Sequence, residues 1–257
     1  MNKYKHQSPI NFNTILEACK KRFAPFELEV ERNRKPISMI TAIKTAHDSG
    51  KNPIIAEVKY RSPTNENSKP QTPDVLAQMM EAGGACAISV LTEPEFFGGS
   101  LENLSLVKNA VTTPVLRKDF IFHPSQIPES YYYGADSILL ITSYFTQPEL
   151  KQMIKTSRSY GMEPLVEVHS SADIETAAKA GAELYAVNNR DKDTLELNLN
   201  RTVEMAPLID GIVISASGVE TPVQLRKVLK HADAALVGTS IMKSPDVELK
   251  VRELTHA

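Results

Sequence analysis

The sequence has no excess of positive charge. Lysine and arginine together number 29 and aspartate and glutamate 31, which makes the formal net charge −2. Domains that bind nucleic acid usually carry a basic surface, so this balance argues against a nucleic-acid partner. A local cluster of basic residues would still suit a small phosphorylated metabolite.

Cysteine is scarce, and long apolar runs are absent. Cys19 and Cys86 are far apart, with no Cys-x-x-Cys pair or cysteine–histidine cluster, so nothing indicates a metal site. We expect both to be buried thiols in a reducing compartment. The opening residues, MNKYKHQSPINFN, lack the apolar core of a signal peptide. No apolar run approaches the roughly 20 residues that span a bilayer, so we expect a soluble, cytoplasmic protein with no membrane partner.

The length and the order of apolar segments indicate an α/β fold. The chain has 257 residues, which fits two small domains or one barrel. No linker or low-complexity segment divides it, and this favours one domain. Strand candidates occur at 53–59, 85–91, 113–118, 136–141, 163–168, 183–188, 211–215 and 234–238. Helical patterns occur between most of them, at 73–82, 101–110, 124–133, 147–160, 171–180, 200–208 and 222–231.

Eight strands alternating with helices predict a single (β/α)8 barrel, a TIM barrel, and a doubly wound sheet is the alternative. Two further helical stretches, at 12–23 and around 38–49, precede the first strand. We therefore predict one domain over residues 1–257, with a helical extension at 1–50 and the barrel at 51–250. From its pattern alone the extension is either a lid or a packing element.

The first strand, PIIAEVKYRSP at residues 53–63, carries two opposite charges at its end. Side chains alternate across a strand, so Ile55, Glu57 and Lys59 share one face. Charged residues are rarely fully buried unless they are paired. Barrel enzymes place their chemistry at the carboxyl ends of the strands, so this pair is a candidate catalytic site. A purely structural ion pair is the alternative.

Other strand ends carry polar side chains on the corresponding face. These residues are Ser89, Lys118, Glu167, Asn188 and Arg190. Lysine can act as an acid, and glutamate is the matching base. The strand at 136–141 is apolar and suits one wall of an aromatic pocket. His169 is also near a strand end, and we interpret it as a structural or rim residue.

The last two strands end in small residues that favour a phosphate site. Ser217, Gly218, Gly238 and Thr239 offer backbone N–H groups with little obstruction, and phosphate often binds after strands seven and eight of this fold. Tight turns are the alternative reading of these glycines. With two lysines, two glutamates and an asparagine, this set predicts cofactor-free proton transfer on a small sugar phosphate.

These segments, taken together, resemble the indole-3-glycerol phosphate synthase family over about residues 10–250. The motifs that carry the resemblance are IIAEVKYRSP, SVLTEPEFFGGS, PVLRKDFI, ADSILLI, GMEPLVEV, VNNRD, ASG and LVGTSIM. The resemblance implies closure of the pyrrole ring of 1-(2-carboxyphenylamino)-1-deoxyribulose 5-phosphate, with release of carbon dioxide and water and without a cofactor or metal. It also implies that the helical extension lies over the barrel mouth. We expect a monomer or weak homodimer.

The resemblance also implies residue roles. Lys118 would protonate the ribulose carbonyl, Lys59 would pair with the substrate carboxylate and assist dehydration, and Glu167 would act as the base. Glu57 and Asn188 would hold hydroxyls and orient the lysines, with Arg190 and Ser89 completing the polar wall. The pocket for the aryl ring would comprise Pro63, Phe97, Phe120, Leu139 and Ile141. Gly218, Gly238 and Thr239 would match the phosphate site.

The sequence departs from the family pattern near the site. Ala216 replaces a glutamate at the end of the seventh strand, and Glu220 on the following loop is a poor substitute. Gly98 replaces an amide residue, the first loop reads SPTNENSKP, and Lys192 takes a place beside the aryl pocket that is often apolar. These changes leave open a paralogue with weakened or altered activity, and a non-catalytic binding barrel. The Glu-x-Lys and Lys-Asp-Phe segments argue against a third alternative, the isomerase of the preceding pathway step.

Overall fold

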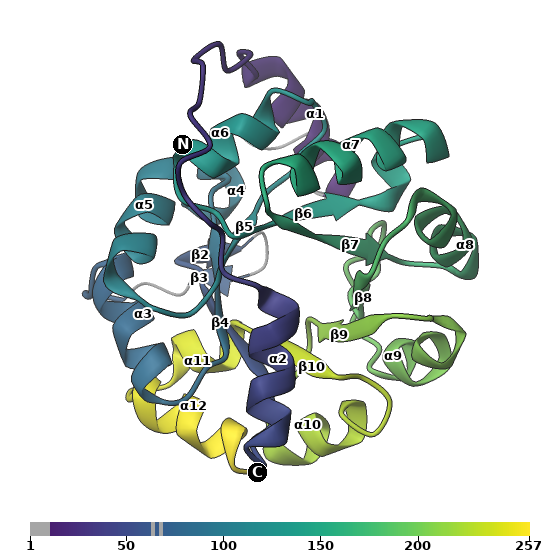
Figure 1. Cartoon of the computed structure of the whole chain (residues 1–257). Helices are drawn as coiled ribbons and strands as arrows, with labels where there is room; N and C mark the ends of the chain where they lie inside the picture. The colour runs from purple at the N-terminus through teal and green to yellow at the C-terminus, as the bar shows by residue number, and fades with distance from the viewer. Residues whose placement is uncertain (1–10, 63–64, 67–68) are drawn as a thin grey trace, which may run out of the picture.

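The computed structural model describes residues 11–62, 65–66 and 69–257. Eight parallel strands close into a barrel, in which each strand pairs with its neighbours in chain order and the last returns to the first (Figure 1). They are β1 (Ile54–Val58), β4 (Ala87–Leu91), β5 (Val115–Lys118), β6 (Ser137–Ile141), β7 (Glu163–Val168), β8 (Leu184–Asn188), β9 (Ile212–Ala216) and β10 (Ala234–Val237). The predicted barrel is confirmed, and the doubly wound alternative is wrong.

Helices cover the outside of the barrel at nearly the predicted positions. They are α3 (Pro73–Ala82), α5 (Leu101–Ala110), α6 (Gln126–Tyr132), α7 (Gln147–Ser159), α8 (Ser171–Ala180), α9 (Asn200–Met205), α10 (Pro222–Val228) and α12 (Val247–Thr255). The sequence did not predict α12 or several short elements. Among the latter are α4 (Pro94–Phe97), α11 (Thr239–Lys243) and the β2–β3 hairpin (Arg61–Ser62 with Asn65–Glu66).

Alternation along the strands separates two apolar layers. Ile54, Ala56 and Val58 of β1 face the surrounding helices and belong to the larger core between helices and sheet. Ile55 faces the barrel interior, where it joins a second cluster with side chains such as Leu116. The interior side chains change from apolar to polar toward the carboxyl ends of the strands, so the predicted site residues face inward.

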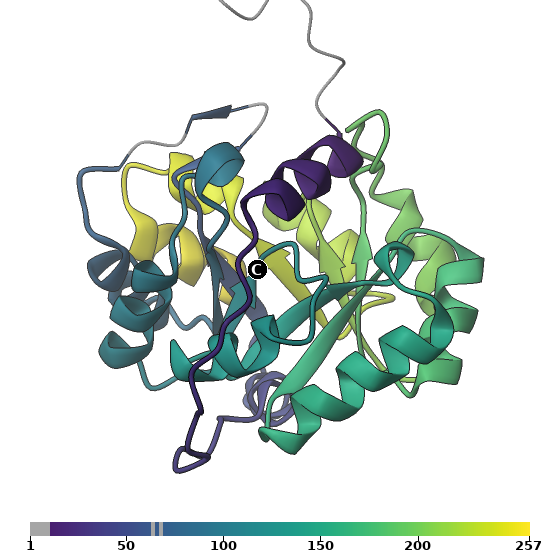
Figure 2. The same ribbon diagram turned by 90° about the horizontal axis from the view of Figure 1, so that it is seen from above.

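The two N-terminal helices lie at opposite ends of the barrel (Figure 2). The first, α1 (Phe12–Arg22), crosses the mouth at the carboxyl ends of the strands, where Phe12 packs edge-on against Phe120. The second, α2 (Met39–Asp48), lies beneath the other end, and its Ile40 N–H donates to the Glu163 carboxylate at the start of β7. Only α1 therefore has the position over the mouth that we expected for the whole extension.

One of the two cysteines is buried as the composition led us to expect. Cys86 is buried, and burial raises its pKa to about 12. Cys19 is only half-buried, although burial together with the charges of Asp119 and Glu93 also raises its pKa to about 12.

In the part of the chain that the structure describes, no helix has the length and apolarity to cross a membrane.

Candidate active site

Glu57 is the centre of the charged groups inside the barrel mouth. Its carboxylate lies 3.1 Å from Lys59 Nζ and 3.5 Å from Lys118 Nζ, which extend from β1 and β5. Ser89 Oγ donates to the same carboxylate at 3.4 Å. Burial raises the pKa of Glu57, but the charges of Lys118 and Lys59 outweigh burial and hold that pKa below its ordinary value. Two potential acids thus share one carboxylate.

Glu167 is the second carboxylate, and it has different partners. It is 1% exposed, and its Oε1 lies 2.9 Å from His169 Nε2. Burial raises the pKa of Glu167, but hydrogen bonds from His169 and Asn188 and the charges of His169 and Lys118 lower it below its ordinary value. The site therefore holds two ionised carboxylates, one paired with lysines and the other with a histidine.

A cavity of about 1000 Å³ that opens to solvent lies above Glu57, and we call it the polar cavity. The predicted residues that line it are Glu57, Lys59, Phe97, Lys118, Asn188, Arg190, Ser217, Gly218, Gly238 and Thr239. It therefore joins the two lysines to the loops after β9 and β10, where we expected a phosphate site. Burial lowers the pKa of Arg190, whose guanidinium also donates to the carbonyl oxygen of Leu195 at 2.8 Å.

Unusual backbone geometry occurs at the end of the polar cavity where we expected a phosphate site. Ser217 and Gly218 both have left-handed conformations, with φ of 69° and 86°. Gly238 follows β10, and a Cβ at this position would lie 2.6 Å from Glu57 Oε1. A larger residue here would collide with the buried Glu57 side chain, so packing favours glycine independently of any phosphate. Thr239 Oγ1 accepts a hydrogen bond from Lys59 Nζ at 3.2 Å.

A second cavity of about 300 Å³, which we call the apolar cavity, lies beside the first. Its lining includes four residues of the predicted aryl pocket, namely Phe97, Phe120, Leu139 and Ile141. Lys118, Phe97 and Phe12 line both cavities. The ammonium of Lys118 thus sits where an aromatic ring in one cavity would meet a sugar chain in the other.

Some candidate residues lie elsewhere. Among the described residues, the linings of the two cavities include neither Ser89, which supports Glu57 from behind, nor Lys192. Lys192 Nζ lies 3.9 Å from Asp193, while the carbonyl oxygen of Lys192 accepts the backbone N–H of Phe12, which lines both cavities, at 3.2 Å. Glu220 lines the polar cavity on the loop that follows Ser217 and Gly218. Pro63 lies outside the described residues.

Ala216 ends β9 at the position where the family pattern has a carboxylate. It is 2% exposed and pairs in register with Asn188 of β8 and Leu236 of β10, which both line the polar cavity. Its side chain belongs to the apolar cluster of the barrel interior. The end of β9 therefore contributes an apolar side chain, and no negative charge, to the barrel interior next to this cavity.

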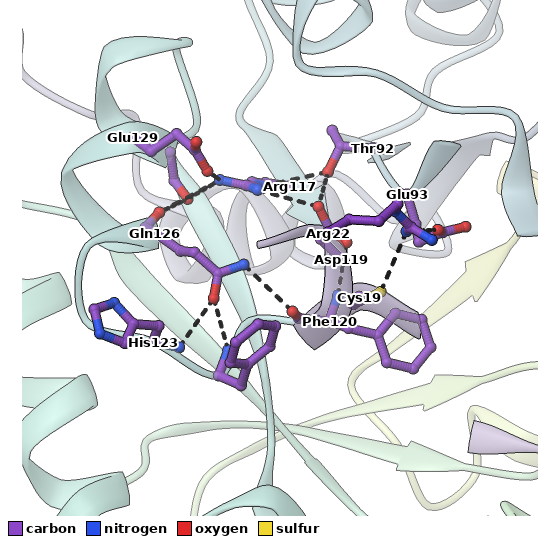
Figure 3. Close-up of polar contacts among 12 residues, drawn as sticks. Cys19, Arg22, Thr92, Glu93, Arg117, Asp119, Phe120, His123, Gln126 and Glu129 are labelled. Atoms are coloured by element: carbon purple, nitrogen blue, oxygen red, sulfur yellow. Dashed lines mark hydrogen bonds and ion pairs between the residues drawn. The ribbon is translucent and has the colours of Figure 1, made fainter. Parts of the chain in front are cut away.

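A polar network, mostly buried, centres on Arg117 and Asp119 (Figure 3). The Arg117 guanidinium donates to Asp119 at 3.1 Å, to Glu129 at 2.8 Å and to Thr92 at 3.3 Å. Thr92 in turn donates to Asp119 at 2.6 Å. Because Arg117 and Asp119 are the sequence neighbours of Lys118, the network anchors the end of β5 on both sides of the lysine.

Two more residues lie at the site. His169, which we interpreted as a structural or rim residue because of its place just after a strand end, contacts Glu167 directly. Phe12 lines both cavities from α1 and packs edge-on against Phe120 and His169. No signal in the sequence placed Phe12 there. Among the described residues, no group of three or more histidine, cysteine or acidic side chains is arranged to hold a metal.

Comparison with known proteins gives one family. The indole-3-glycerol phosphate synthase family model matches residues 10–254. The indole-3-glycerol phosphate synthase of Aquifex aeolicus is 42% identical over 206 residues, which cover 78% of this chain and 80% of the relative. That of Methanocaldococcus jannaschii is 41% identical over 232 residues, covering 88% of this chain and 86% of the relative.

Solved structures agree at the level of the fold. The tryptophan synthase alpha chain from Legionella pneumophila matches with a TM-score of 0.62 and 13% identity, covering 88% of this chain and 96% of that one. The 3-hexulose-6-phosphate synthase from Salmonella typhimurium matches with a TM-score of 0.65 and 14% identity, covering 79% and 96%. At these identities the similarity shows the barrel architecture alone.

Proposed function

The chain belongs to the indole-3-glycerol phosphate synthase family, and we propose how its residues divide the work of that reaction. The enzyme is a carboxy-lyase of tryptophan biosynthesis and acts on a phosphorylated sugar. It converts 1-(2-carboxyphenylamino)-1-deoxyribulose 5-phosphate to indole-3-glycerol phosphate, with loss of carbon dioxide and water. A carbon of the aryl ring must attack the ribulose carbonyl, and the developing alkoxide needs a proton.

We propose that Lys118 is the general acid that supplies this proton. Its ammonium lines both the apolar and the polar cavity, which is the place where the ring carbon and the carbonyl would meet. Glu57 lies 3.5 Å from Lys118 Nζ, and this ion pair holds the ammonium at the boundary of the two cavities. This position between the two cavities is the observation that carries the assignment.

The other charged groups take complementary roles in this proposal. Loss of carbon dioxide restores the aromaticity of the aryl ring. Lys59 pairs with the substrate carboxylate and assists the later loss of water, for which Glu167 accepts a proton from the new five-membered ring as the hydroxyl group leaves. Glu57 and Asn188 hold hydroxyls and orient the lysines. Ser89 acts by supporting the Glu57 carboxylate, and Arg190 contributes charge to the polar wall.

We propose that the substrate spans both cavities. The aryl ring would occupy the apolar cavity between Phe120 and the β6 side chains, and the phosphate would bind the N–H groups near Ser217, Gly218 and Gly238. Holding both ends limits the motion of the ribulose chain, and such orientation can supply a large part of catalysis. This matters because ring attack interrupts the aromaticity of the aryl group.

Turnover by the purified protein tests the function. With the carboxyphenylamino-deoxyribulose phosphate as substrate, we expect indole fluorescence to rise while carbon dioxide is released in equal amount. A substrate that binds tightly with no carbon dioxide release would contradict the assignment and favour a binding protein.

A second candidate function rests on Ala216, which leaves the floor of the site without the family's carboxylate. In that case the barrel would be a paralogue with weakened or redirected activity on a related anilino-sugar phosphate. The variant Ala216→Glu separates the two. This variant restores the family's carboxylate at the end of β9, so we expect its kcat to exceed that of the native protein if the native protein is the weakened paralogue.

The comparison of Ala216→Glu with the native protein at neutral pH is also informative. If only the variant turns over the substrate, the native protein is the altered paralogue. If both do, the glutamate is dispensable in this chain. The control Ala216→Gln adds similar volume without charge and should leave kcat where the native protein has it.

We also propose that residues 1–257 act as one domain in the cytoplasm, as a monomer or weak homodimer. The closed barrel and the α1 cover support a site that one chain completes by itself. Light scattering after size-exclusion chromatography should give a mass near 28.4 kDa at low concentration. A stable higher oligomer would contradict this proposal.

A further inference from the structure

We propose that His169 is a positioning residue that keeps Glu167 ionised and apart from Lys118, so that the base and the acid of the reaction remain separate groups. The inference rests on the proposed role of Glu167 as the base. It assigns a function to a side chain that the family motifs did not single out.

The first observation is the contact itself. His169 Nε2 lies 2.9 Å from Glu167 Oε1, and the two side chains are 5% and 2% exposed. Two acceptors cannot face each other at this distance, so a proton lies between them. Because Glu167 is held in its ionised form, that proton belongs to Nε2, and the histidine donates to the carboxylate.

The second observation is how the ring is held. The backbone N–H of His169 donates to Asp173 Oδ2 at 2.8 Å, at the start of α8. Phe12 covers the ring edge-on, with the ring centroids 5.9 Å apart. His169 Nδ1 is buried and finds no hydrogen-bond partner within the described part of the chain. The only polar contact that the ring makes there is therefore the one to Glu167.

The third observation is the division of charges in the site. Lys59 and Lys118 both pair with Glu57, at 3.1 and 3.5 Å. Lys118 and Glu167 line the same apolar cavity. Without a donor of its own, the Glu167 carboxylate would therefore be a second partner for Lys118, and Ala216 offers no other carboxylate in the barrel interior. An acid paired tightly with its own base is a poor donor to substrate. The hydrogen bond from His169 gives Glu167 a different partner.

Other charged and titratable groups face this pair from each neighbouring element. Lys118 approaches from β5, Asp173 from α8, and Tyr144 from the turn after β6 (Thr142–Tyr144). Burial raises the pKa of Tyr144, followed by the charge of Glu167, so the phenol is neutral. Lys118 is then the other positive group that favours the Glu167 carboxylate, and its contribution is present in every His169 variant.

The sign of the pH effect follows from the lowered pKa of Glu167. The base works as a carboxylate, which is present above this pKa and is lost as the pH falls through it. Removing the donor in His169→Phe raises the pKa of Glu167, so kcat falls at a higher pH when the solution is made more acidic. We expect this fall, the acidic limb of the pH profile of kcat, to move up by about one pH unit.

The matched variant is His169→Gln, whose amide can donate to Glu167 from a similar position. We expect it to keep the acidic limb within about 0.3 pH units of the native value, whereas His169→Phe does not. His47→Gln alters an exposed histidine far from the mouth and should change neither the limb nor kcat. A merely structural role for His169 would lower stability or kcat without moving the limb.

A second measurement does not depend on turnover. Titration of carbon-13-labelled glutamate carboxyls by NMR, with Glu167→Gln to assign the signal, reports the ionisation of Glu167 in the free protein. The inference would be overturned if Glu167 titrated in His169→Phe as it does in the native protein. It would also be overturned if Glu167 titrated alike in His169→Gln and His169→Phe. A native protein that shows no turnover but has the expected titration would refute the proposed function and leave the pairing intact.

Discussion

Replacing Lys118 with alanine is expected to lower kcat about 10²–10⁴-fold, because a positioned general acid typically contributes a factor of this size. The variant removes the ammonium from the boundary between the two cavities, and water must then protonate the alkoxide. Lys59 keeps its contact with Glu57 at 3.1 Å, so binding of the substrate should weaken much less than turnover. Steady-state kinetics that follow indole fluorescence measure both effects.

The matched control for Lys118→Ala is Lys192→Ala. Lys192 lies near the mouth of the barrel, but its side chain is more than a third exposed and pairs loosely with Asp193. Its replacement should leave kcat within about twofold, since exposed ion pairs contribute little. Undiminished turnover by a folded Lys118→Ala protein would remove the lysine from the mechanism, and circular dichroism establishes that the fold is retained.

Replacing Asp136 with asparagine is expected to lower the free energy of unfolding by about 3 kcal/mol, the cost of breaking a buried ion pair. The Asp136 carboxylate is fully buried and lies 2.7 Å from Arg34 and 2.6 Å from Lys108. It also accepts the backbone N–H groups of Ile37 and Val115. The amide cannot satisfy these four donors. Urea denaturation should show a lower midpoint for the variant.

The expected loss of stability in Asp136→Asn arises because the ion pair is buried, and Glu175→Gln breaks an exposed ion pair for comparison. Glu175 pairs with Lys179 at 2.6 Å on α8, but both side chains are about two-thirds exposed. This replacement should leave the urea midpoint close to that of the native protein, because exposed ion pairs contribute little to stability. Equal effects of the two substitutions would show that Asp136 does not anchor the segment between α1 and α2 to the barrel.

The alternation of side chains along each strand could be predicted from the sequence, and with it most of the barrel interior. Glu57, Lys118, Glu167 and Asn188 all face inward as predicted, because a strand has a strict period of two residues. The strand-and-helix rhythm likewise predicted the closed barrel. In a parallel barrel the carboxyl ends of all strands meet at one end, so polar residues at those ends converge there.

The partners of these side chains depended on the tertiary structure. Periodicity tells which face a residue occupies but not which distant residue it meets. Asp136 belonged to a strand that we interpreted as an apolar wall, yet its position before β6 joins it to Arg34 and Lys108. We expected the whole N-terminal extension to lie over the barrel mouth. Its two helices instead lie at opposite ends of the barrel, because the segment between α1 and α2 runs along the outside of the barrel.

The same distinction applies at the catalytic centre. The sequence by itself determined that two lysines and two glutamates would gather inside a barrel mouth. Only the folded chain decided that both lysines pair with Glu57 while His169 pairs with Glu167, and that Phe12 covers the histidine. The Lys118–Glu57 and Phe12–His169 contacts join residues far apart in the chain, and they form only when strand closure and the packing of α1 bring those residues together. Lys59 and His169 each lie two residues from their glutamate, and the packing around the barrel mouth holds these side chains in contact.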